Sequence, residues 1–248
     1  MDKINISIVI ATYNAENYIK KALSSVLAQK YLNWECLIID GASKDKTISI
    51  IEEFEKRDSR IRHISEKDKG IYDAFNKGWK NAVGEWVYYL GSDDALTYEG
   101  IYEQMKVVDE ASSKIGVING GVIRVNTDNK QKVCLSKGYF GGHQGMIMRR
   151  TALEELGGFD TKYKILGDYD LFVRMKKSKY EVINTENILA YYNAGGTSEK
   201  IKYAKVVFAE KYSILKTEFP FMKAFIISLY DTLRMIVGRI IHNRSLYV

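Results

Sequence analysis

Short apolar segments alternate with amphipathic segments through the first 90 residues of the chain. The apolar runs lie at 6–11, 34–39, 61–64 and 85–90 and are nearly uninterrupted, as in strands that are buried on both faces of a parallel sheet. Between them, in segments that begin near residues 16, 44 and 72, apolar side chains recur every three or four positions and predict helices. The alternation predicts an α/β fold with a Rossmann-like, doubly wound, mostly parallel central sheet and helices on both faces.

The second half of the chain is less regular. We expect helices at 98–111, 151–156 and 171–177, and strands at 115–119, 121–126, 181–184 and 188–192, with 130–135 pairing to one of these strands. No Pro- or Ser-rich linker and no internal repeat divides the chain. We therefore predict one domain over 1–198, with halves at 1–97 and 98–198, followed by a C-terminal amphipathic helical extension at 199–248.

Polar side chains stand where three of the predicted strands end. Thr12 and Tyr13 follow the first strand, Asp40 ends the second, and Asp93 and Asp94 follow the fourth. Ligands of open α/β sheets bind just beyond the carboxyl ends of the strands. Two adjacent carboxylates there can hold a divalent cation, which can hold a diphosphate. The alternative is that this Gly-Ser-Asp-Asp segment is only a turn, because these residue types dominate turns.

Two common phosphate-binding motifs are missing from the sequence. No G-x-G-x-x-G follows the first strand, and no G-x-x-x-x-G-K-S/T occurs anywhere. A dinucleotide fingerprint and a phosphate-binding P-loop are therefore excluded. We expect the phosphates of any bound nucleotide to be held by a metal ion.

The composition is that of an ordinary globular protein, with 46% hydrophobic and 27% charged residues. The net charge of +6 favours acidic partners such as nucleotide phosphates or an anionic membrane, whereas scattered Lys and Arg give only a weak nucleic-acid footprint. Cys36 and Cys134 lie far apart and outside any C-x-x-C pattern, which argues against a disulfide framework and a cysteine zinc site. The chain lacks signal-peptide features and an apolar run of about 18 residues, so we expect a cytoplasmic protein.

Six motifs follow one another along the chain. They are Ile8-Val9-Ile10-Ala11-Thr12-Tyr13-Asn14-Ala15-Glu16, Asp40-Gly41-Ala42-Ser43-Lys44-Asp45-Lys46-Thr47, Asp68-Lys69-Gly70 through Asn76-Lys77-Gly78, Gly91-Ser92-Asp93-Asp94, Gly157-Gly158-Phe159-Asp160 and Gly167-Asp168-Tyr169-Asp170-Leu171. In this order, over roughly residues 4 to 200, the chain resembles the family-2 glycosyltransferases of GT-A fold, the bacterial polysaccharide type. An ordered set of motifs is more specific than any one of them.

The resemblance implies a metal-dependent, inverting glycosyltransferase. Such an enzyme would use Mn²⁺ or Mg²⁺ to move a hexose or N-acetylhexosamine from a UDP-sugar to an acceptor hydroxyl. The implied role is surface polysaccharide biosynthesis, such as lipopolysaccharide O-antigen or capsule, on a glycan or lipid-linked saccharide. The half at 1–97 would bind the nucleotide and the half at 98–198 the acceptor, with no nucleic-acid partner.

The matched motifs imply roles for individual residues. The departing diphosphate needs a cation, which we assign to Asp94, with Asp93 on the ribose or sharing the metal. The attacking hydroxyl needs a carboxylate that takes its proton, which we assign to Asp168. Asp40 is expected to accept the ring N–H of uracil. The full set of expected nucleotide contacts is Ala11, Thr12, Tyr13, Glu16, Asp40, Asp68, Gly70 and Asp93.

Structural explanations compete with these roles. Asp168 could serve only to cap a helix, and Asp40 could be a turn residue. His143 could be a second metal ligand, an acceptor contact or a structural residue, and we leave it out of the metal set. The loop Gly195-Gly196-Thr197-Ser198 matches one that lies near acceptor and diphosphate in relatives.

Three positions depart from the family pattern. Gly91 replaces the first Asp of the usual D-x-D-D element, so the metal and ribose contacts fall on Asp93 and Asp94 alone. Phe75 replaces an Arg, so Lys67 or Lys69 could compensate the diphosphate charge instead. Gly167 replaces the Glu of an E-D pair and leaves Asp168 as the only obvious base there.

The extension ends in a predicted helix at 221–242, preceded by Pro220, the only proline. Its apolar positions share one face and its charged positions gather opposite: Phe225, Leu229, Leu233, Ile236, Val237 and Ile240 against Lys223, Asp231, Arg234 and His242. The helix either packs on the domain or on a second subunit of a homodimer, or lies on anionic lipid at the cytoplasmic face of the inner membrane.

Two rival function classes remain open. A protein that binds a nucleotide sugar without turning it over would keep the sheet and Asp40, and Gly167 and Phe75 leave room for it. A nucleotidyltransferase would also use a sheet-end metal, but it would bring a glycine- and lysine-rich phosphate loop near the N-terminus. Residues 11–14 are not such a loop.

Overall fold

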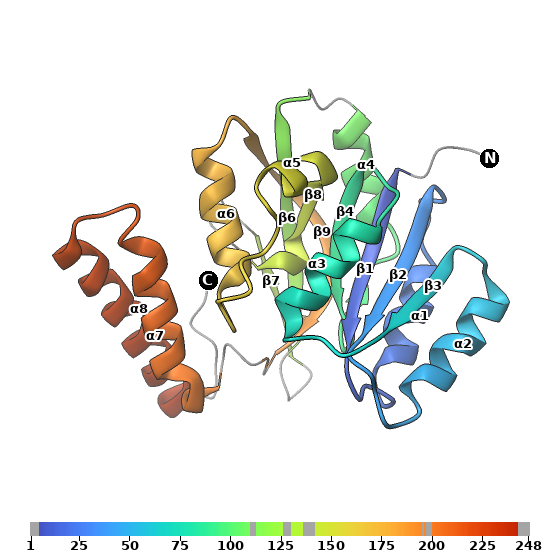
Figure 1. Cartoon of the computed structure of the whole chain (residues 1–248), viewed down its shortest axis with the longest axis horizontal. Coiled ribbons are helices and arrows are strands. Elements are labelled where there is room, and N and C mark those ends of the chain that lie inside the picture. The colour runs from blue at the N-terminus through green and yellow to red at the C-terminus, as the bar shows by residue number, and fades with distance from the viewer. Residues whose placement is uncertain are drawn as a thin grey trace.

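The computed structural model describes residues 5–109, 113–125, 130–135, 142–194, 196 and 200–242. A nine-stranded mixed sheet with the strand order β3-β2-β1-β4-β8-β6-β9-β5 forms its centre, and β7 pairs with β6 (Figure 1). The predicted α/β class is confirmed.

The first half of the chain forms the parallel part of the sheet, as the alternation of segments predicts. β1 (Ile6–Thr12), β2 (Trp34–Asp40), β3 (Ile61–Ser65) and β4 (Trp86–Gly91) run parallel. The helices between them are α1 (Ile19–Leu27), α2 (Thr47–Arg57) and α3 (Ile71–Asn81). All of these elements end within a few residues of the predicted bounds.

The second half adds antiparallel strands that the sequence pattern does not resolve. β8 (Met146–Arg149) lies between β4 and β6 and is antiparallel to both. β6 (Ile115–Val125) and β9 (Glu181–Asn193) are long neighbouring strands, and each was expected as two short ones. Register shifts near residues 115–117 and 119–122 interrupt the side-chain alternation within the pair, which explains the wrong prediction. β5 (Ala95–Leu96) and β7 (Gln131–Cys134) complete the sheet, and helices α4 (Gly100–Asp109), α5 (Arg150–Glu155) and α6 (Gly167–Lys177) accompany it.

Strict alternation along the central strands builds a core on each face of the sheet. On β1, for example, Ile8 and Ile10 face a cluster with α1, α2 and α4, whereas Val9 faces a cluster with α3, α5 and α6. Cys36 is buried in the first cluster as expected, and both cysteines are free. Gly78 lets α3 approach the sheet closely, because a Cβ atom there would lie 2.3 Å from a methyl carbon of Val9.

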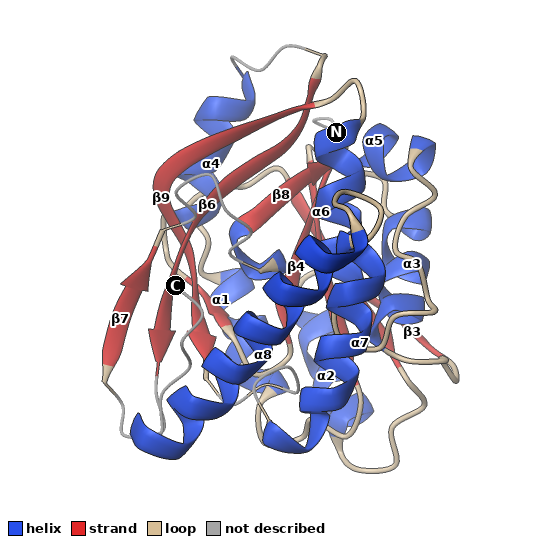
Figure 2. Ribbon diagram, turned by 90° about the vertical axis from the view of Figure 1, so that its left-hand side faces the viewer, coloured by secondary structure: helices blue, strands red, loops and turns tan. Residues whose placement is uncertain are grey.

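The C-terminal extension is a helical hairpin at the end of the molecule away from β3 (Figures 1 and 2). The predicted helix at 221–242 is α8 (Phe221–His242), and it lies along a second helix, α7 (Ala204–Leu215), that the sequence pattern does not single out. Short helices η1 (His143–Gly145) and η3 (Ile201–Tyr203) precede β8 and α7. None of the helices in the described ranges is both long enough and apolar enough to cross a membrane.

Candidate active site

The carboxyl ends of three strands meet at one edge of the sheet. In the parallel register, Thr12 of β1 pairs with Asp40 of β2, and Ala11 pairs with Gly91 of β4. The predicted strand-end residues therefore lie side by side. This arrangement is the one expected for a ligand site in an open α/β sheet.

Hydrogen bonds connect the loop after β1 to the loop after β2. The backbone N–H of Asn14 donates to Ser43 Oγ at 2.8 Å, and that of Ala15 donates to Thr47 Oγ1 at 2.7 Å. The Glu16 side chain accepts from the N–H of Lys46 at 2.9 Å, so it supports the loop from within. The predicted nucleotide loop is thus held in one conformation before any ligand binds.

Asp40 is fully buried and already has three hydrogen bonds. Its carboxylate accepts from the N–H of Ser43 at 2.9 Å, and from the hydroxyls of Ser43 and Ser65 at 2.5 and 2.7 Å. These bonds fix the turn after β2, in which Ala42 has a positive φ of 61°. In this conformation the side chain supports the turn and faces no solvent.

The rim of the site is formed by groups that remain open. Tyr13 is 62% exposed. Its ring and the carboxylate of Asp68 both lie close to Gly41, since a Cβ atom on that residue would be 2.9 Å from Asp68 Oδ2. Asp68 also accepts from the N–H of Gly70, whose φ of 129° starts α3. Thr12 Oγ1 is buried without a hydrogen-bond partner in the described part of the structure. An unpaired buried hydroxyl costs free energy, which a bound ligand can recover.

Asp94 is the most perturbed carboxylate of the site. It is 1% exposed, and its Oδ1 accepts the backbone N–H of Asn193 at 2.8 Å. Burial, together with the neighbouring charge of Asp93, raises the pKa of Asp94 to about 7. Asp93 itself is exposed at the surface. One carboxylate is thus desolvated beside another, an arrangement that a divalent cation stabilises.

Gly91 makes this position of Asp94 possible. A Cβ atom on residue 91 would lie 2.4 Å from Asp94 Oδ2, well inside contact distance. Asp94 therefore occupies the space that the side chain of the usual Asp would need. The departure at residue 91 is a packing requirement of this chain.

The turn η1 joins Asp94 to Asp168. The side chain of Gln144 lies near Asp94 and helps to lower the pKa of its carboxyl, and His143 Nδ1 lies 3.1 Å from Asp168 Oδ2. Tyr88 of β4 holds the turn from below by donating from its hydroxyl to the carbonyl of Gln144 at 2.8 Å. The two carboxylates predicted as metal ligand and base therefore belong to one site. From the sequence, we left His143 out of the metal set and did not consider Gln144. The contact of His143 with Asp168 is between residues 25 positions apart, so no local pattern indicates it.

Asp168 lies in the first turn of α6 and is largely buried. Its Oδ1 accepts the N–H of Tyr169 at 2.9 Å and lies 3.2 Å from the hydroxyl of Tyr72, which donates to the carbonyl of Ile165 at 2.5 Å. Burial and the charge of Asp168 raise the pKa of Tyr72, so this hydroxyl stays protonated. Asp168 therefore has a fixed orientation, which a general base needs.

The two other departures from the family pattern also have packing reasons. A Cβ atom on Gly167 would lie 2.8 Å from the ring of Tyr72, so no Glu fits there. Phe75 is buried, with its ring centroid 4.4 Å from that of Tyr89 and 5.1 Å from that of His143. It supports the imidazole that contacts Asp168.

Helix α7 holds the loop in front of Asp168. The buried carboxylate of Glu210 accepts three consecutive backbone N–H groups, from Lys164 at 2.7 Å, Ile165 at 3.1 Å and Leu166 at 2.9 Å. These groups precede the first turn of α6. The extension is thus part of the site's support, a role that its sequence does not reveal.

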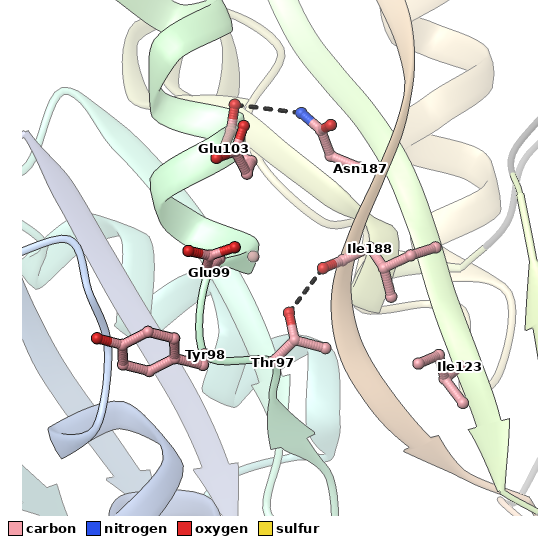
Figure 3. A pocket seen from close by; sticks show the side chains of 8 residues that line it. Thr97, Tyr98, Glu99, Glu103, Ile123, Asn187 and Ile188 are labelled. Carbon is pink, nitrogen blue, oxygen red and sulfur yellow. Dashed lines mark hydrogen bonds between the residues drawn. The ribbon is translucent and has the colours of Figure 1, made fainter.

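Other predicted features lie outside the site or outside the described residues. Of the glycine-rich loop at 195–198, only Gly196 is described. A pocket lies between the start of α4 and β9, and neither Asp94 nor Asp168 lines it (Figure 3). Its polar groups are paired, since Thr97 donates to the carbonyl of Ile188 at 2.7 Å and Asn187 to that of Glu103 at 3.1 Å. We assign this pocket no role.

Comparison with known proteins decides the family. The model described as Glycosyl transferase family 2 matches residues 7–157, more than half of the chain. The chain belongs to glycosyl transferase family 2. It is 26% identical over 211 residues to a PGL/p-HBAD biosynthesis glycosyltransferase of Mycobacterium tuberculosis, and the aligned region covers 79% of each protein. It is 32% identical over 114 residues to the glycosyltransferase GlyA of Streptococcus pneumoniae, over 46% of this chain and 16% of that protein.

Solved structures of glycosyltransferases share the fold of this family-2 enzyme. TarS residues 1–349 from S. aureus, in complex with UDP-GlcNAc, superposes with a TM-score of 0.67 at 19% identity, over 97% of this chain and 76% of that one. The mannosyltransferase PcManGT from Pyrobaculum calidifontis, in complex with GDP-Man and Mn²⁺, gives 0.68 at 15% identity, over 98% and 76%. The glycosyltransferase assignment and the GT-A fold expected from the sequence are confirmed.

The raised pKa of Asp94 predicts that, without a divalent cation, the folded protein becomes less stable as the pH rises toward 7. The folded protein keeps the proton that the unfolded chain loses near pH 3.8, so the free energy of unfolding falls by up to about 1.4 kcal/mol per pH unit between pH 4 and 7. In Asp94→Asn, residue 94 cannot ionise, so this pH dependence of the free energy of unfolding is absent. In urea titrations with EDTA, we expect its stability relative to wild type to rise across this window and level off above it. A constant difference from pH 4 to 8 would contradict the desolvation of Asp94.

Restoring a side chain at residue 91 should harm the site. Gly91→Ala displaces the Asp94 carboxylate, and Gly91→Asp does so despite adding a family ligand, so we expect donor turnover to fall by tenfold or more, about 1.4 kcal/mol. The control is Ser92→Ala at the next position. Higher turnover in Gly91→Asp would show that the lost ligand matters more than the packing.

The hydrogen bonds of Glu210 to the loop at 164–166, which we call the Glu210 clamp, predict that a change in α7 alters the rate of sugar transfer. Glu210→Gln sets an amide N–H₂ against backbone donors, so we expect kcat to fall about tenfold with the donor KM unchanged. Glu210→Asp, which keeps the charge, should recover part of the rate. Lys205→Gln on the exposed side of the same helix is the control. An unchanged kcat in Glu210→Gln would limit the clamp to a structural role.

Proposed function

We propose that this glycosyltransferase catalyses an inverting transfer of a hexose or N-acetylhexosamine from a UDP-sugar to an acceptor hydroxyl. The observation that carries the proposal is the turn at 143–145, which lies beside both Asp94 and Asp168 at the carboxyl edge of the sheet. In this proposal Asp94 serves the charged leaving group, and Asp168 is the base. We place the reaction in surface polysaccharide biosynthesis, with O-antigen and capsule as examples.

The open rim provides the nucleotide contacts in this proposal. Tyr13 offers an exposed ring to a base, Thr12 an unpaired hydroxyl, and Asp68 a carboxylate at the start of α3. Uracil recognition by Asp40 requires the hydroxyl of Ser43 or Ser65 to turn away, because both now donate to it. The TarS complex with UDP-GlcNAc supports a uridine donor, and the PcManGT complex with GDP-Man provides the alternative nucleotide for the test.

The residues at the end of β4 fit a divalent cation that arrives with the donor. Within the described residues, no three His, Cys, Asp or Glu side chains form a complete metal cage. Mg²⁺ and similar cations are commonly held by one or two carboxylates together with substrate phosphates, and Asp94 and Asp93 supply such a pair. A bound Mn²⁺ or Mg²⁺ would neutralise charge on the diphosphate as a Lewis acid.

The chain's own groups orient the attack. Asp168 accepts the proton of the acceptor hydroxyl at Oδ2, the oxygen that contacts His143. Oδ1 is fixed by the N–H of Tyr169, which leaves Oδ2, on the side of η1, for the acceptor in this proposal. An acceptor carried on a lipid would bring the enzyme to the cytoplasmic face of the membrane.

A donor screen tests the proposal. Purified enzyme is incubated with Mn²⁺ or Mg²⁺ and UDP-, GDP- or dTDP-sugars, and release of the nucleoside diphosphate is measured. We expect slow release from one UDP-sugar, abolished by EDTA and reduced 100-fold or more in Asp94→Asn, since the cation's charge stabilisation is worth several kcal/mol. Asp168→Asn should abolish transfer to an added acceptor but leave UDP binding intact.

The rival classes predict different results in the same screen. UDP binding without release, even with lipid-linked acceptors, would favour a protein that binds nucleotide sugars without turnover. Pyrophosphate formation from a sugar phosphate and UTP would favour a nucleotidyltransferase. Release that neither substitution affects would mean that the site lies elsewhere.

A further inference from the structure

The outer face of α8 carries an unusual concentration of exposed apolar side chains. Of the sixteen large hydrophobic side chains that are exposed in the described part of the chain, eight lie on this helix. They are Phe221, Met222, Phe225, Ile226, Leu229, Tyr230, Leu233 and Val237, and we call them the α8 outer face. A contiguous apolar strip of this kind on one helix marks an interaction surface.

The inner face of α8 packs against α7. Ala224, Ser228, Thr232 and Met235 are buried, at intervals that follow one side of the helix. The two hydroxyls donate within the helix, from Ser228 to the carbonyl of Ala224 and from Thr232 to that of Ser228, each at 2.8 Å. At the margin of the outer face, Phe225 packs edge-on against Phe208 of α7 and Phe221 against Tyr212. The other side chains of the outer face, from Met222 to Val237, are exposed to solvent.

The extension also carries most of the net charge of the protein. Residues 199–248 contain nine Lys and Arg against four Asp and Glu, whereas residues 1–198 contain 28 against 27. The three acidic side chains of the extension that the structure describes turn inward: Glu210 holds the loop at 164–166, Glu218 pairs with Lys177, and Asp231 pairs with Lys211. The surface left facing outward is apolar and basic.

Exposed basic residues stand along the margin of the apolar strip. Lys223 and Arg234 are exposed on one flank of the α8 outer face, and Lys202 and Lys205 are exposed on the neighbouring η3 and α7. Long basic side chains at such a margin can reach lipid phosphates while the apolar side chains enter the acyl boundary. We propose that the α8 outer face docks on an anionic lipid bilayer and lies in its surface plane.

This surface lies outside the catalytic machinery and does not depend on which sugar is donated. It suits the lipid-linked acceptor of the proposed function, because docking would bring the enzyme to the plane that holds the acceptor. Glu210 and the Lys211–Asp231 pair would connect the docked hairpin to the loop before Asp168. From the sequence, we grouped Asp231 with Lys223 and Arg234 opposite the apolar positions, and in the structure Asp231 pairs with Lys211 of α7.

Vesicle co-sedimentation of the full chain tests the docking. The wild-type protein is mixed with vesicles of phosphatidylcholine alone or with about 30 mol % phosphatidylglycerol, at low and high salt. We expect binding at least about tenfold stronger to the anionic vesicles and weaker binding at high salt. Ile226→Asp/Leu233→Asp and Lys223→Glu/Arg234→Glu should each lower the partition coefficient by tenfold or more. Leu32→Asp, which changes an exposed apolar residue outside the extension, is the matched control and should bind like wild type.

Three results would overturn the docking. The first is wild-type protein that does not bind anionic vesicles. The second is apolar-face variants that bind as wild type does. The third is a wild-type dimer in light scattering that Ile226→Asp/Leu233→Asp converts to a monomer, which would make the face an interface between copies. UDP release without vesicles should be unchanged in all variants. Its absence from wild type would count against the proposed function, whereas vesicle binding is measured without any donor.

Discussion

The site depends on one desolvated carboxylate, that of Asp94, packed into the space beneath the end of β4. It fits there because residue 91 has no side chain, and the backbone N–H of Asn193 donates to it. Burying this group beside Asp93 is costly, and this cost is the physical reason for proposing a cation here. The turn beside Asp94 also contacts Asp168, so the two proposed catalytic carboxylates share one support.

The support extends from the sheet edge to the C-terminal hairpin. Tyr72 and His143 contact the carboxylate of Asp168, and Glu210 binds the backbone in front of it. The proposed base is thus held by groups from α3, η1 and α7, which are far apart in sequence. Such convergence would restrict the motion of a catalytic group, as precise proton transfer requires. It also means that changes in the hairpin can reach the reaction without touching the substrate.

Much of this could be predicted from the sequence, and the exceptions have physical causes. Buried parallel strands and their helices have strong periodicities, so β1 to β4 were predicted accurately, as was α8. β6 and β9 were predicted in pieces because their register shifts break the alternation. The proposed metal and base residues, Asp94 and Asp168, stand in motifs at the end of a strand and the start of a helix, and the structure places both at one edge of the sheet. The clamp by Glu210 and the packing behind Gly91 and Gly167 are long-range contacts, and no local pattern encodes them.

Binding of Mn²⁺, followed through the paramagnetic resonance signal of the free ion, tests the central claim most directly. With wild-type enzyme, the free-ion signal should fall sharply only when UDP is present, because Asp94 and the diphosphate complete the coordination together. Asp94→Asn should leave most of the ion free even with UDP, and Lys205→Gln should behave as wild type. Equal UDP affinity in EDTA and in Mn²⁺, unchanged by Asp94→Asn, would contradict the assignment of the end of β4 as the cation and diphosphate site.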